Sequence, residues 1–349
     1  MITVHYDKKP IYSIVFGRNF LDATTHLKEL DVDKKRVCIV TDSTVASYYL
    51  KEVEELFSTI ARKVTSFVFP AGEENKQLST IENLYEHLIN HQFDRKDLLV
   101  ALGGGVVGDM TGYAAATYLR GISFIQMPTT LLSQVDSSIG GKTGVDFKSY
   151  KNMVGAFYQP SLVYMNLSTL KTLTKRQYIE GMGEIIKHSL IKDASYYSWL
   201  KDHKDEILEL NLDVCEEMIE RSCQIKRQVV ENDPTEKGER GLLNFGHTLG
   251  HAIEKEKGFS LLHGECVALG CVSASWISYE KGLISKEDYE DIIKTFEAFK
   301  LPIKVEITDS NSVLEAVKHD KKMEAGIIKF ILLKKLGKLI LTEVLMIMS

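Results

Sequence analysis

The first half of the chain alternates short apolar runs, rich in β-branched residues, with longer amphipathic stretches. The apolar runs predict buried strands at residues 36–41, 64–69, 97–102, 123–127 and 162–165. The stretches between them have helical periodicity at residues 45–60, 79–92 and 106–119. Because strands and helices that alternate in this way form a mostly parallel sheet with helices on both faces, we expect an α/β domain here.

The pattern changes at about residue 175, where long, charged amphipathic segments begin. Helices are predicted at residues 175–200, 207–231, 241–257, 265–281 and 286–300. Near the end of the chain, apolar runs at 328–333 and 338–342 flank a short turn and predict a hairpin. We therefore expect a largely α-helical second domain, with the junction near 165–180 and the domains at 1–172 and 173–349.

Composition narrows the class of protein. A net charge of −5 over 349 residues gives no general attraction for nucleic acid or for a membrane surface. The 5 cysteines form no CxxC pair, which favours free thiols in a reducing cytoplasm. The N-terminus lacks the pattern of a signal peptide, and no uncharged apolar run approaches the roughly 18 residues that span a bilayer. We expect a soluble, cytoplasmic protein.

A glycine-rich turn follows the predicted strand at 97–102. Residues 103–108, Gly-Gly-Gly-Val-Val-Gly, satisfy the G-x-G-x-x-G pattern and open an alanine-rich stretch. Glycines at such a turn let backbone N–H groups approach a pyrophosphate at a helix N-terminus, which favours a dinucleotide site. The turn lies at about the fourth strand rather than the first, and no acid follows some 20 residues later. A tight strand-to-helix turn with no ligand is the alternative.

Histidines and carboxylates gather in the second half. His247 and His251 are four residues apart and share one face of a helix, and Glu184 and His188 repeat that spacing. His263 follows in a His-Gly-Glu sequence. Imidazole and carboxylate ligands suit Zn²⁺, and three of them with an open position define a catalytic site. Spacing alone predicts that both His247 and His251 bind the metal. The glutamate that follows the first histidine in metalloproteases is absent here, so the general base of such an enzyme is missing.

A second small-residue segment, 133–144, carries Asp136 and Lys142 among glycines and hydroxyls. We expect a loop whose backbone N–H groups and lysine bind phosphate or a polyol. Since the protein as a whole is acidic, an anionic substrate needs a local group of cations, for which the candidates are Arg120, Lys151 beside Asn152, Lys187, Lys226 and Arg240. The pair Lys175-Arg176 is expected to be surface charge only.

These segments together resemble the 3-dehydroquinate synthase family. The matching stretches run in order through most of the chain, at residues 70–76, 102–112, 120–121, 128–144, 151–157, 183–187, 242–251 and 263–265. The resemblance implies a homodimer with a Rossmann-like N-terminal domain, a helical C-terminal domain and a site in the cleft between them.

The resemblance also implies roles for individual residues. Glu184, His247 and His263 would hold Zn²⁺ or Co²⁺, which moves His251 from the metal to the substrate side. NAD⁺ would contact Asp42, Gly72, Glu73, Lys76, Gly104, Gly105, Val106, Asp109, Thr129, Thr130, Lys142, Lys151, Thr169, Leu170, Lys171 and Thr172. The substrate would contact Asp136, Lys142, Asn152, Lys187, Lys226, Arg240, Asn244 and His251. Arg120 would reach the phosphate in the neighbouring subunit's site.

The reaction implied is conversion of 3-deoxy-D-arabino-heptulosonate 7-phosphate to 3-dehydroquinate and phosphate. It proceeds by transient NAD-dependent oxidation, phosphate elimination, reduction and intramolecular aldol closure, within the shikimate pathway of aromatic amino-acid biosynthesis. Two departures stand out: residues 146–150 replace the turn common in the family, and a short C-terminus leaves Lys321 and Lys322 as alternative phosphate contacts.

Three other functions are compatible with parts of the pattern. A sister sugar-phosphate cyclase would use the same metal and NAD sites, but its neutral hexose phosphate offers no carboxylate to Arg240, Lys226 or Lys187. A metal-dependent polyol dehydrogenase would release NADH and need no phosphate pocket. A non-catalytic sugar-phosphate sensor would not need to keep Asp136 and every metal ligand.

Overall fold

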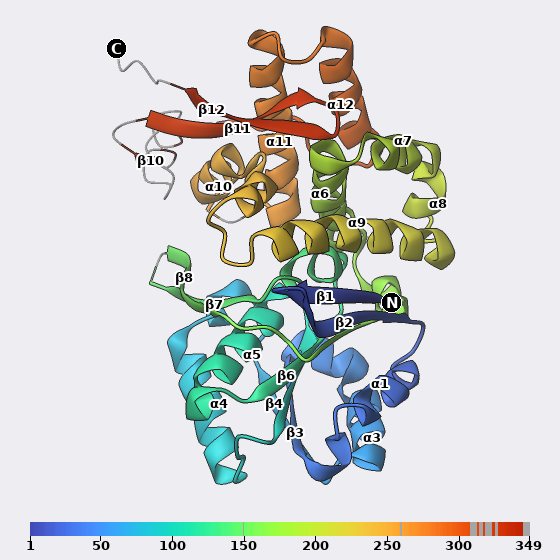
Figure 1. Ribbon diagram of the computed structural model, residues 1–349, viewed down its shortest axis with the longest axis vertical. Helices are drawn as coiled ribbons and strands as arrows, with labels where there is room; N and C mark the ends of the chain where they lie inside the picture. Colours follow the sequence, from blue (N-terminus) through green and yellow to red (C-terminus); the bar gives the residue numbers. More distant parts are fainter. Residues whose placement is uncertain are drawn as a thin grey trace. The chain divides into compact units, whose positions relative to one another are not determined.

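The computed structural model describes residues 1–148, 150–258, 260–307 and 327–344, together with Val313, Val317, Met323 and Glu324. The chain divides into two compact units, Met1–Thr172 and Leu173–Ser349 (Figure 1). Lys321 and Lys322 lie outside the described residues.

A seven-stranded sheet forms the centre of the first unit, with the strand order β1-β2-β9-β6-β5-β3-β4. Every neighbouring pair is parallel except β1 and β2, which form an antiparallel hairpin at one edge. The strands are β1 Ile2–Tyr6, β2 Lys9–Gly17, β3 Arg36–Asp42, β4 Lys63–Phe69, β5 Leu98–Gly103, β6 Ser123–Pro128 and β9 Leu162–Asn166. The mostly parallel sheet is confirmed, whereas β1 and β2 were not predicted.

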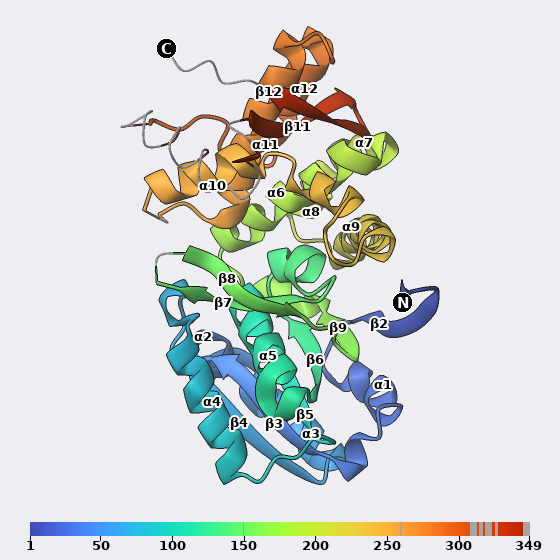
Figure 2. The ribbon, with the colours of Figure 1, turned by 60° about the vertical axis from the view of Figure 1, so that its left-hand side comes forward.

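Both faces of this sheet are buried, which explains why its central strands are apolar at nearly every position. In β3, Val37 and Ile39 belong to one apolar cluster, and Cys38 and Val40 belong to the other. The first cluster includes side chains of α1 (Thr24–Lys28) and α3 (Lys51–Ile60), and the second those of α4 (Leu78–Asn90) and α5 (Gly105–Thr117). Figure 2 shows α4 and α5 together on one face of the sheet.

The segment 133–144, predicted as a loop, is more regular than expected. Its first part is a π-helical turn, η6 (Ser133–Ser137), in which the Ser138 N–H donates to the Ser133 carbonyl at 3.1 Å. Its end begins β7 (Lys142–Phe147), which pairs antiparallel with β8 (Tyr150–Phe157). The loop prediction was therefore wrong at both ends, because a π-turn and an isolated hairpin leave weak signals in hydrophobic periodicity.

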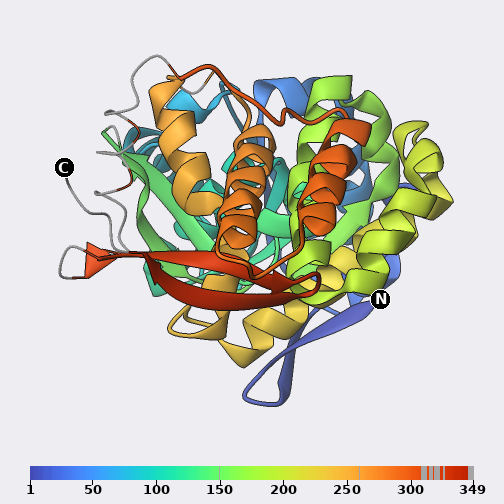
Figure 3. The same ribbon diagram turned by 90° about the horizontal axis from the view of Figure 1, so that it is seen from above.

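Helices dominate the second unit, as predicted. They are α6 Lys175–Lys192, α7 Ala194–Asp202, α8 Lys204–Leu208, α9 Leu212–Asn232, α10 His247–Glu256, α11 His263–Glu280 and α12 Lys286–Ala298. The predicted hairpin is also confirmed, as β11 (Ile327–Lys335) and β12 (Lys338–Val344), with β10 (Met323–Glu324) beside β11. Figure 3 shows this hairpin beside the helices, where the Leu333 N–H donates to the Ser278 Oγ of α11 at 3.0 Å.

Three predicted helices are each interrupted in the structure. Asp193 ends α6 and accepts hydrogen bonds from the first backbone N–H groups of α7, and Asn211 caps α9 in the same way. Gly246, with a φ of +79°, separates the 3₁₀ segment η8 (Glu239–Asn244) from α10. Short side chains that bond to a backbone N–H compete with helix propagation, which accounts for the first two breaks.

Among the helices of the described residues, none combines the length and the apolar character that a membrane span requires.

The start of α6 yields a stability prediction. The Thr174 hydroxyl accepts from the Gln177 N–H at 3.2 Å, and the Gln177 Oε1 accepts from the Thr174 N–H at 3.1 Å. Thr174→Ala removes half of this capping box and should lower the free energy of unfolding by about 1 kcal/mol. Thermal unfolding is the measurement, and Thr174→Ser, which keeps the hydroxyl, should retain most of the stability. Equal midpoints for the alanine variant and the parent protein would contradict the capping role.

Candidate metal and cofactor site

A buried carboxylate lies at the centre of a histidine cluster in the second unit. Glu184, on α6, is 0% exposed. Its Oε1 atom lies 3.6 Å from the Nε2 of His247 and 3.5 Å from the Nε2 of His263. The three residues come from α6, α10 and α11, and each offers a ligand atom within 4.8 Å of the others. This arrangement brings together the three predicted metal ligands.

The distances from the Glu184 Oε1 to the two histidine Nε2 atoms fit three ligands of one tetrahedral metal ion better than they fit direct hydrogen bonds. Two donors bound to one zinc ion at about 2.0–2.2 Å lie about 3.3–3.6 Å apart. A hydrogen bond between a nitrogen and an oxygen is shorter, at about 2.7–3.2 Å. A carboxylate with two imidazoles is a donor set that suits Zn²⁺ or Co²⁺. The residues present therefore fit the metal that the resemblance implies.

The His247 ring is oriented by its second nitrogen. Nδ1 lies 3.3 Å from the backbone carbonyl of Phe245, and because a carbonyl only accepts, Nδ1 carries the proton in this contact. The Nε2 lone pair is then left on the side of Glu184. A histidine that binds a metal through one ring nitrogen commonly donates a hydrogen bond from the other ring nitrogen to a backbone carbonyl, which fixes the orientation of the ring.

Glycines bring the three helices close enough for this cluster to form. A Cβ atom on Gly264 would lie 1.8 Å from the Glu180 carbonyl oxygen, and one on Gly183 would lie 2.3 Å from the Gly264 carbonyl oxygen. Between α10 and α11, a Cβ atom on Gly270 would lie 1.9 Å from the Gly246 carbonyl oxygen. Backbones thus meet directly beside Glu184, His247 and His263, and no side chain fits between them.

Two more residues of α6 surround the Glu184 carboxylate. Lys187, only 1% exposed, forms an ion pair with Oε2, and the His188 Nε2 lies 3.8 Å from the same atom. Burial would raise the pKa of the Glu184 carboxyl, but Lys187 and the His263 and His188 imidazoles hold that pKa well below its usual range. Glu184 is therefore charged at neutral pH, as a metal ligand must be.

His251 belongs to an adjoining group. Its ligand atom lies within 4.8 Å of those of Glu254 and His263. Its ring centroid is 5.0 Å from that of His247 and 6.0 Å from that of His263. Glu254, only 5% exposed, is a carboxylate that motif reasoning had not singled out. His251 thus adjoins the candidate metal ligands, on the same helix as His247.

Buried cations supply the candidate anion contacts of this unit. Lys226, on α9, is 5% exposed, and Arg240, in η8, is 2% exposed. The Arg240 Nη1 donates to the Pro234 carbonyl at 2.8 Å, while the Asn244 Nδ2 donates to the Glu236 Oε1 at 2.9 Å. Guanidinium and ammonium groups bind carboxylates and phosphates through charge-assisted hydrogen bonds, so Lys226 and Arg240 are the candidate anion contacts of this unit.

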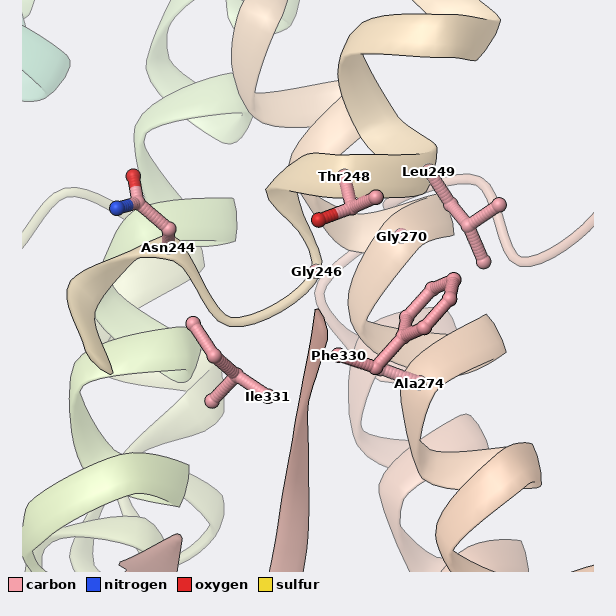
Figure 4. Close-up of a pocket in the computed structure, with 8 residues that line it drawn as sticks. All are labelled: Asn244, Gly246, Thr248, Leu249, Gly270, Ala274, Phe330 and Ile331. Atoms are coloured by element: carbon pink, nitrogen blue, oxygen red, sulfur yellow. The ribbon is translucent and has the colours of Figure 1, made fainter. Parts of the chain in front are cut away.

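A small cavity lies beside this group, and its volume is about 10 Å³, room for one water molecule. It is lined by Asn244, Gly246, Thr248, Leu249, Gly270, Ala274, Phe330 and Ile331. Figure 4 shows Leu249 pointing toward the Phe330 ring, so the lining is largely apolar. The cavity is too small for a sugar phosphate, and we assign it no ligand.

In the first unit, the predicted NAD contacts gather at one edge of the sheet. Asp42, Gly72, Gly104, Thr129 and Thr169 lie at or just beyond the carboxyl ends of β3, β4, β5, β6 and β9. Because these strands are parallel, all five positions are at the same edge, where open α/β sheets bind their ligands. The Thr129 N–H donates to the Gly103 carbonyl at 3.0 Å and joins two of the segments directly.

The glycine-rich turn opens α5 as predicted. Gly104 is its N-cap, and Gly105 and Val106 are its first residues. A Cβ atom on Gly108 would lie 2.7 Å from the Gln126 Oε1 of β6, so this glycine allows the helix to pack on the sheet. Gly105 is less restricted, since a Cβ atom there would lie 3.2 Å from the Ser137 Oγ. The backbone N–H groups at the start of a helix are the groups with which such a turn can bind an anion.

A polar network surrounds Lys76, which is 4% exposed. Its Nζ donates to the Asp109 Oδ2 at 2.7 Å and to the Asn152 Oδ1 at 2.6 Å, and the Glu73 Oε1 lies 3.9 Å away. Lys151 lies 4.0 Å from the same Glu73 oxygen. Burial opposes the charged form of Lys76, but Asp109 and Glu73 raise the pKa of its ammonium above the usual value. Five of the predicted contacts are therefore in one network.

The remaining predicted residues of this unit are placed separately. Thr169, Leu170, Lys171 and Thr172 lie in the 3₁₀ helix η7 (Leu167–Thr172), and the Tyr49 hydroxyl donates to the Thr169 carbonyl at 3.4 Å. Thr130 bonds to Ser133, and Asp136 lies in η6. Lys142 is exposed at the start of β7, and Arg120 is exposed in a 3₁₀ turn with a φ of +66°.

Arg176 lies at the surface, as expected, and has a partner that was not predicted. It makes a two-point ion pair with Glu265, from Nε to Oε1 at 2.7 Å and from Nη2 to Oε2 at 2.6 Å. The side chain is 53% exposed, so the predicted surface position is confirmed, and the ion pair with Glu265 is an addition to that prediction. The partners are 89 residues apart, and nothing in the local sequence pairs them.

Comparison with known proteins identifies the family. The N-terminal model of 3-dehydroquinate synthase matches residues 66–180, and the C-terminal model matches residues 181–323. The chain belongs to the 3-dehydroquinate synthase family. A 3-dehydroquinate synthase of Psychrobacter cryohalolentis is 46% identical over 347 residues, which cover 98% of this chain and 93% of that one.

Two solved structures of the wider family share the fold. A 2-deoxy-scyllo-inosose synthase, complexed with carbaglucose-6-phosphate, NAD⁺ and Co²⁺, is 28% identical with a TM-score of 0.89 and covers 98% of this chain and 96% of its own. A 2-epi-5-epi-valiolone synthase from Streptomyces hygroscopicus, with NAD⁺ and Zn²⁺ bound, is 26% identical with a TM-score of 0.88. The match covers 97% of this chain and 93% of that one. Both structures contain NAD⁺ and a divalent metal ion.

The glycine contacts yield a prediction. Gly264→Ala forces a methyl group onto the Glu180 carbonyl, so α6 and α11 must move apart; we expect a loss of about 3 kcal/mol in stability and a lower zinc content. Zinc stoichiometry and thermal unfolding are the measurements. Gly241→Ala is the matched control, because no atom of the described residues lies within 4 Å of a Cβ atom there. Full zinc content in the Gly264 variant would show that the close contact is not needed.

Proposed function

We propose that this chain is a 3-dehydroquinate synthase, which converts 3-deoxy-D-arabino-heptulosonate 7-phosphate to 3-dehydroquinate and phosphate. The observation that carries the proposal is the cluster of Glu184, His247 and His263 in a chain of this family. The reaction belongs to the shikimate pathway, and we propose the cytoplasm as its location.

The second unit, in this proposal, is the metal- and substrate-binding domain. Glu184, His247 and His263 would hold Zn²⁺ or Co²⁺, and the ion would supply a Lewis acid that acidifies a substrate hydroxyl. Arg240 and Lys226 pair with the substrate carboxylate, since a planar guanidinium can bind both oxygens of that group. Their burial supports this role. Lys187 and Asn244 are further substrate contacts.

The first unit is proposed as the NAD-binding domain. Bound in this unit, NAD⁺ would supply a hydride acceptor for the substrate C5 and would be restored within the same turnover, so we expect no net NADH. The N-terminus of α5 and the Lys76 network are the features that support binding of the dinucleotide. Asp136 orients the C5 hydroxyl. His251, beside the metal ligands, assists removal of the C6 proton that the neighbouring ketone makes acidic.

The phosphate contacts are proposed to be Lys142, Asn152 and Arg120. Elimination needs cations at the leaving group, where negative charge accumulates. Arg120 and Lys142 are both exposed, and we propose that Arg120 serves the neighbouring site of a homodimer.

The related cyclases suggest one alternative substrate class, the hexose phosphates. Lys226 and Arg240 favour the heptulosonate instead, because a hexose phosphate carries no carboxylate for these two buried cations. A polyol dehydrogenase differs in outcome rather than in fold, since it accumulates NADH.

The function can be tested by product formation. Chelator-treated protein is incubated with 3-deoxy-D-arabino-heptulosonate 7-phosphate and NAD⁺, with and without Zn²⁺, while phosphate and NADH are followed together. We expect phosphate release that depends on the metal, with no net NADH. Absence of phosphate release after metal is restored would rule out the synthase, and NADH formed from polyols would indicate a dehydrogenase.

Asp136→Asn tests the role of the first unit in catalysis. If Asp136 orients the C5 hydroxyl, kcat should fall by about 100-fold, while zinc content and NAD⁺ binding remain unchanged. Asp202→Asn, which changes an exposed carboxylate at the end of α7, is the control and should retain full activity. Undiminished turnover in the Asp136 variant would remove this residue from the mechanism.

A further inference from the structure

An ion pair connects the first turns of the two helices that carry Glu184 and His263. Arg176 lies in the first turn of α6, and Glu265 lies in the first turn of α11. Both Glu265 oxygens accept from the Arg176 guanidinium, at 2.7 and 2.6 Å. We call this pair the Arg176–Glu265 clamp.

The clamp also fixes the backbone that leads to His263. The Glu265 Oε2 accepts from the Leu262 N–H at 2.8 Å, and the Arg176 Nη2 donates to the Ser260 carbonyl at 3.0 Å. Leu262 directly precedes His263 in the chain. The position of this histidine therefore depends on two side chains that do not themselves touch the candidate metal ligands.

The connection to Glu184 runs through α6. Residues 176 and 184 are eight positions apart on one helix, about 12 Å along its axis. A rigid helix transmits the position of Arg176 to Glu184, and the close contact of Gly183 with Gly264 holds α6 and α11 together between these points. The clamp and the glycine contact together fix the separation of Glu184 from His263.

We propose that Arg176 and Glu265 are positioning residues that set the metal affinity of the Glu184, His247 and His263 cluster. The inference rests on the proposed function, because it takes these three residues as the metal ligands. The Arg176 side chain is 53% exposed and that of Glu265 is 13% exposed, and an ion pair that reaches solvent in this way contributes little to stability by itself. Contacts that orient a metal ligand matter more, and their loss commonly lowers metal affinity by about 10–100-fold.

The test measures the zinc dissociation constant by competition with a chromogenic chelator, alongside thermal unfolding of the zinc-free protein. Arg176→Ala should weaken zinc binding by about 10-fold or more. Arg176→Lys retains the positive charge but not the two-point contact. Its zinc dissociation constant should lie between those of the parent protein and Arg176→Ala. Glu265→Gln keeps an oxygen for the Leu262 N–H and loses the charge pair, so it should resemble the lysine variant. The double variant, Arg176→Ala with Glu265→Gln, should bind zinc no more weakly than Arg176→Ala alone, because both substitutions remove the same ion pair.

The control is Lys201→Ala. Lys201 and Asp291 form an ion pair of the same length, 2.6 Å, between α7 and α12, with side chains that are 41% and 36% exposed. Its loss should lower the unfolding midpoint of the zinc-free protein about as much as Arg176→Ala does, without changing zinc affinity. If the Arg176 and Glu265 variants all bind zinc within about twofold of the parent protein, the clamp has no positioning role. Should Arg176→Ala fail to fold, the lysine and glutamine variants decide the question.

His247→Ala separates failure of the inference from failure of the proposed site. If this variant keeps full zinc affinity, the cluster is not the metal site, and the proposed function fails with it. If it loses zinc while the clamp variants do not, the site stands and only the inference is overturned.

Discussion

The contact between backbones at Gly264 and Glu180 is the constraint on which the candidate metal site depends. A methyl group at Gly264 would lie 1.8 Å from the Glu180 carbonyl oxygen, so α6 and α11 touch with no side chain between them. Only at this separation does Glu184 come within 3.5 Å of the His263 Nε2. The contact of Gly270 with Gly246 does the same for α10, which carries His247. The distances between the candidate metal ligands are thus set by the contacts between helix backbones.

Much of the fold was predictable because its central strands are buried on both faces. Val37, Cys38, Ile39 and Val40 make one apolar run, and that run predicted β3 directly. The edge hairpin β1–β2 and the pair β7–β8 were missed, since their exposed positions interrupt the apolar pattern. Helix ends at Asp193 and Asn211 were missed as well, because a side-chain cap is a local hydrogen bond that periodicity does not report.

The candidate site was predictable in part. Spacing indicated His247 and His251 as a pair on one helix, and the structure brings His263 and Glu184 to His247 from two other helices. No spacing rule could join positions so far apart in the chain; the family resemblance supplied that set. Arg176 shows the limit most clearly, because a charged residue next to Lys175 has no local sign of a partner 89 residues away. Such contacts depend on tertiary packing.

All three donors of the cluster belong to the second unit, yet they come from distant points of its chain. An ion bound to positions 184, 247 and 263 joins α6, α10 and α11 at one point. It therefore acts as a cross-link, which removes loop entropy from the unfolded chain as a disulfide would. By mass action, the stability of this unit follows the concentration of free metal. For an ion held by these three candidate ligands, the supply of metal would therefore affect the folding equilibrium of this unit as well as its chemistry.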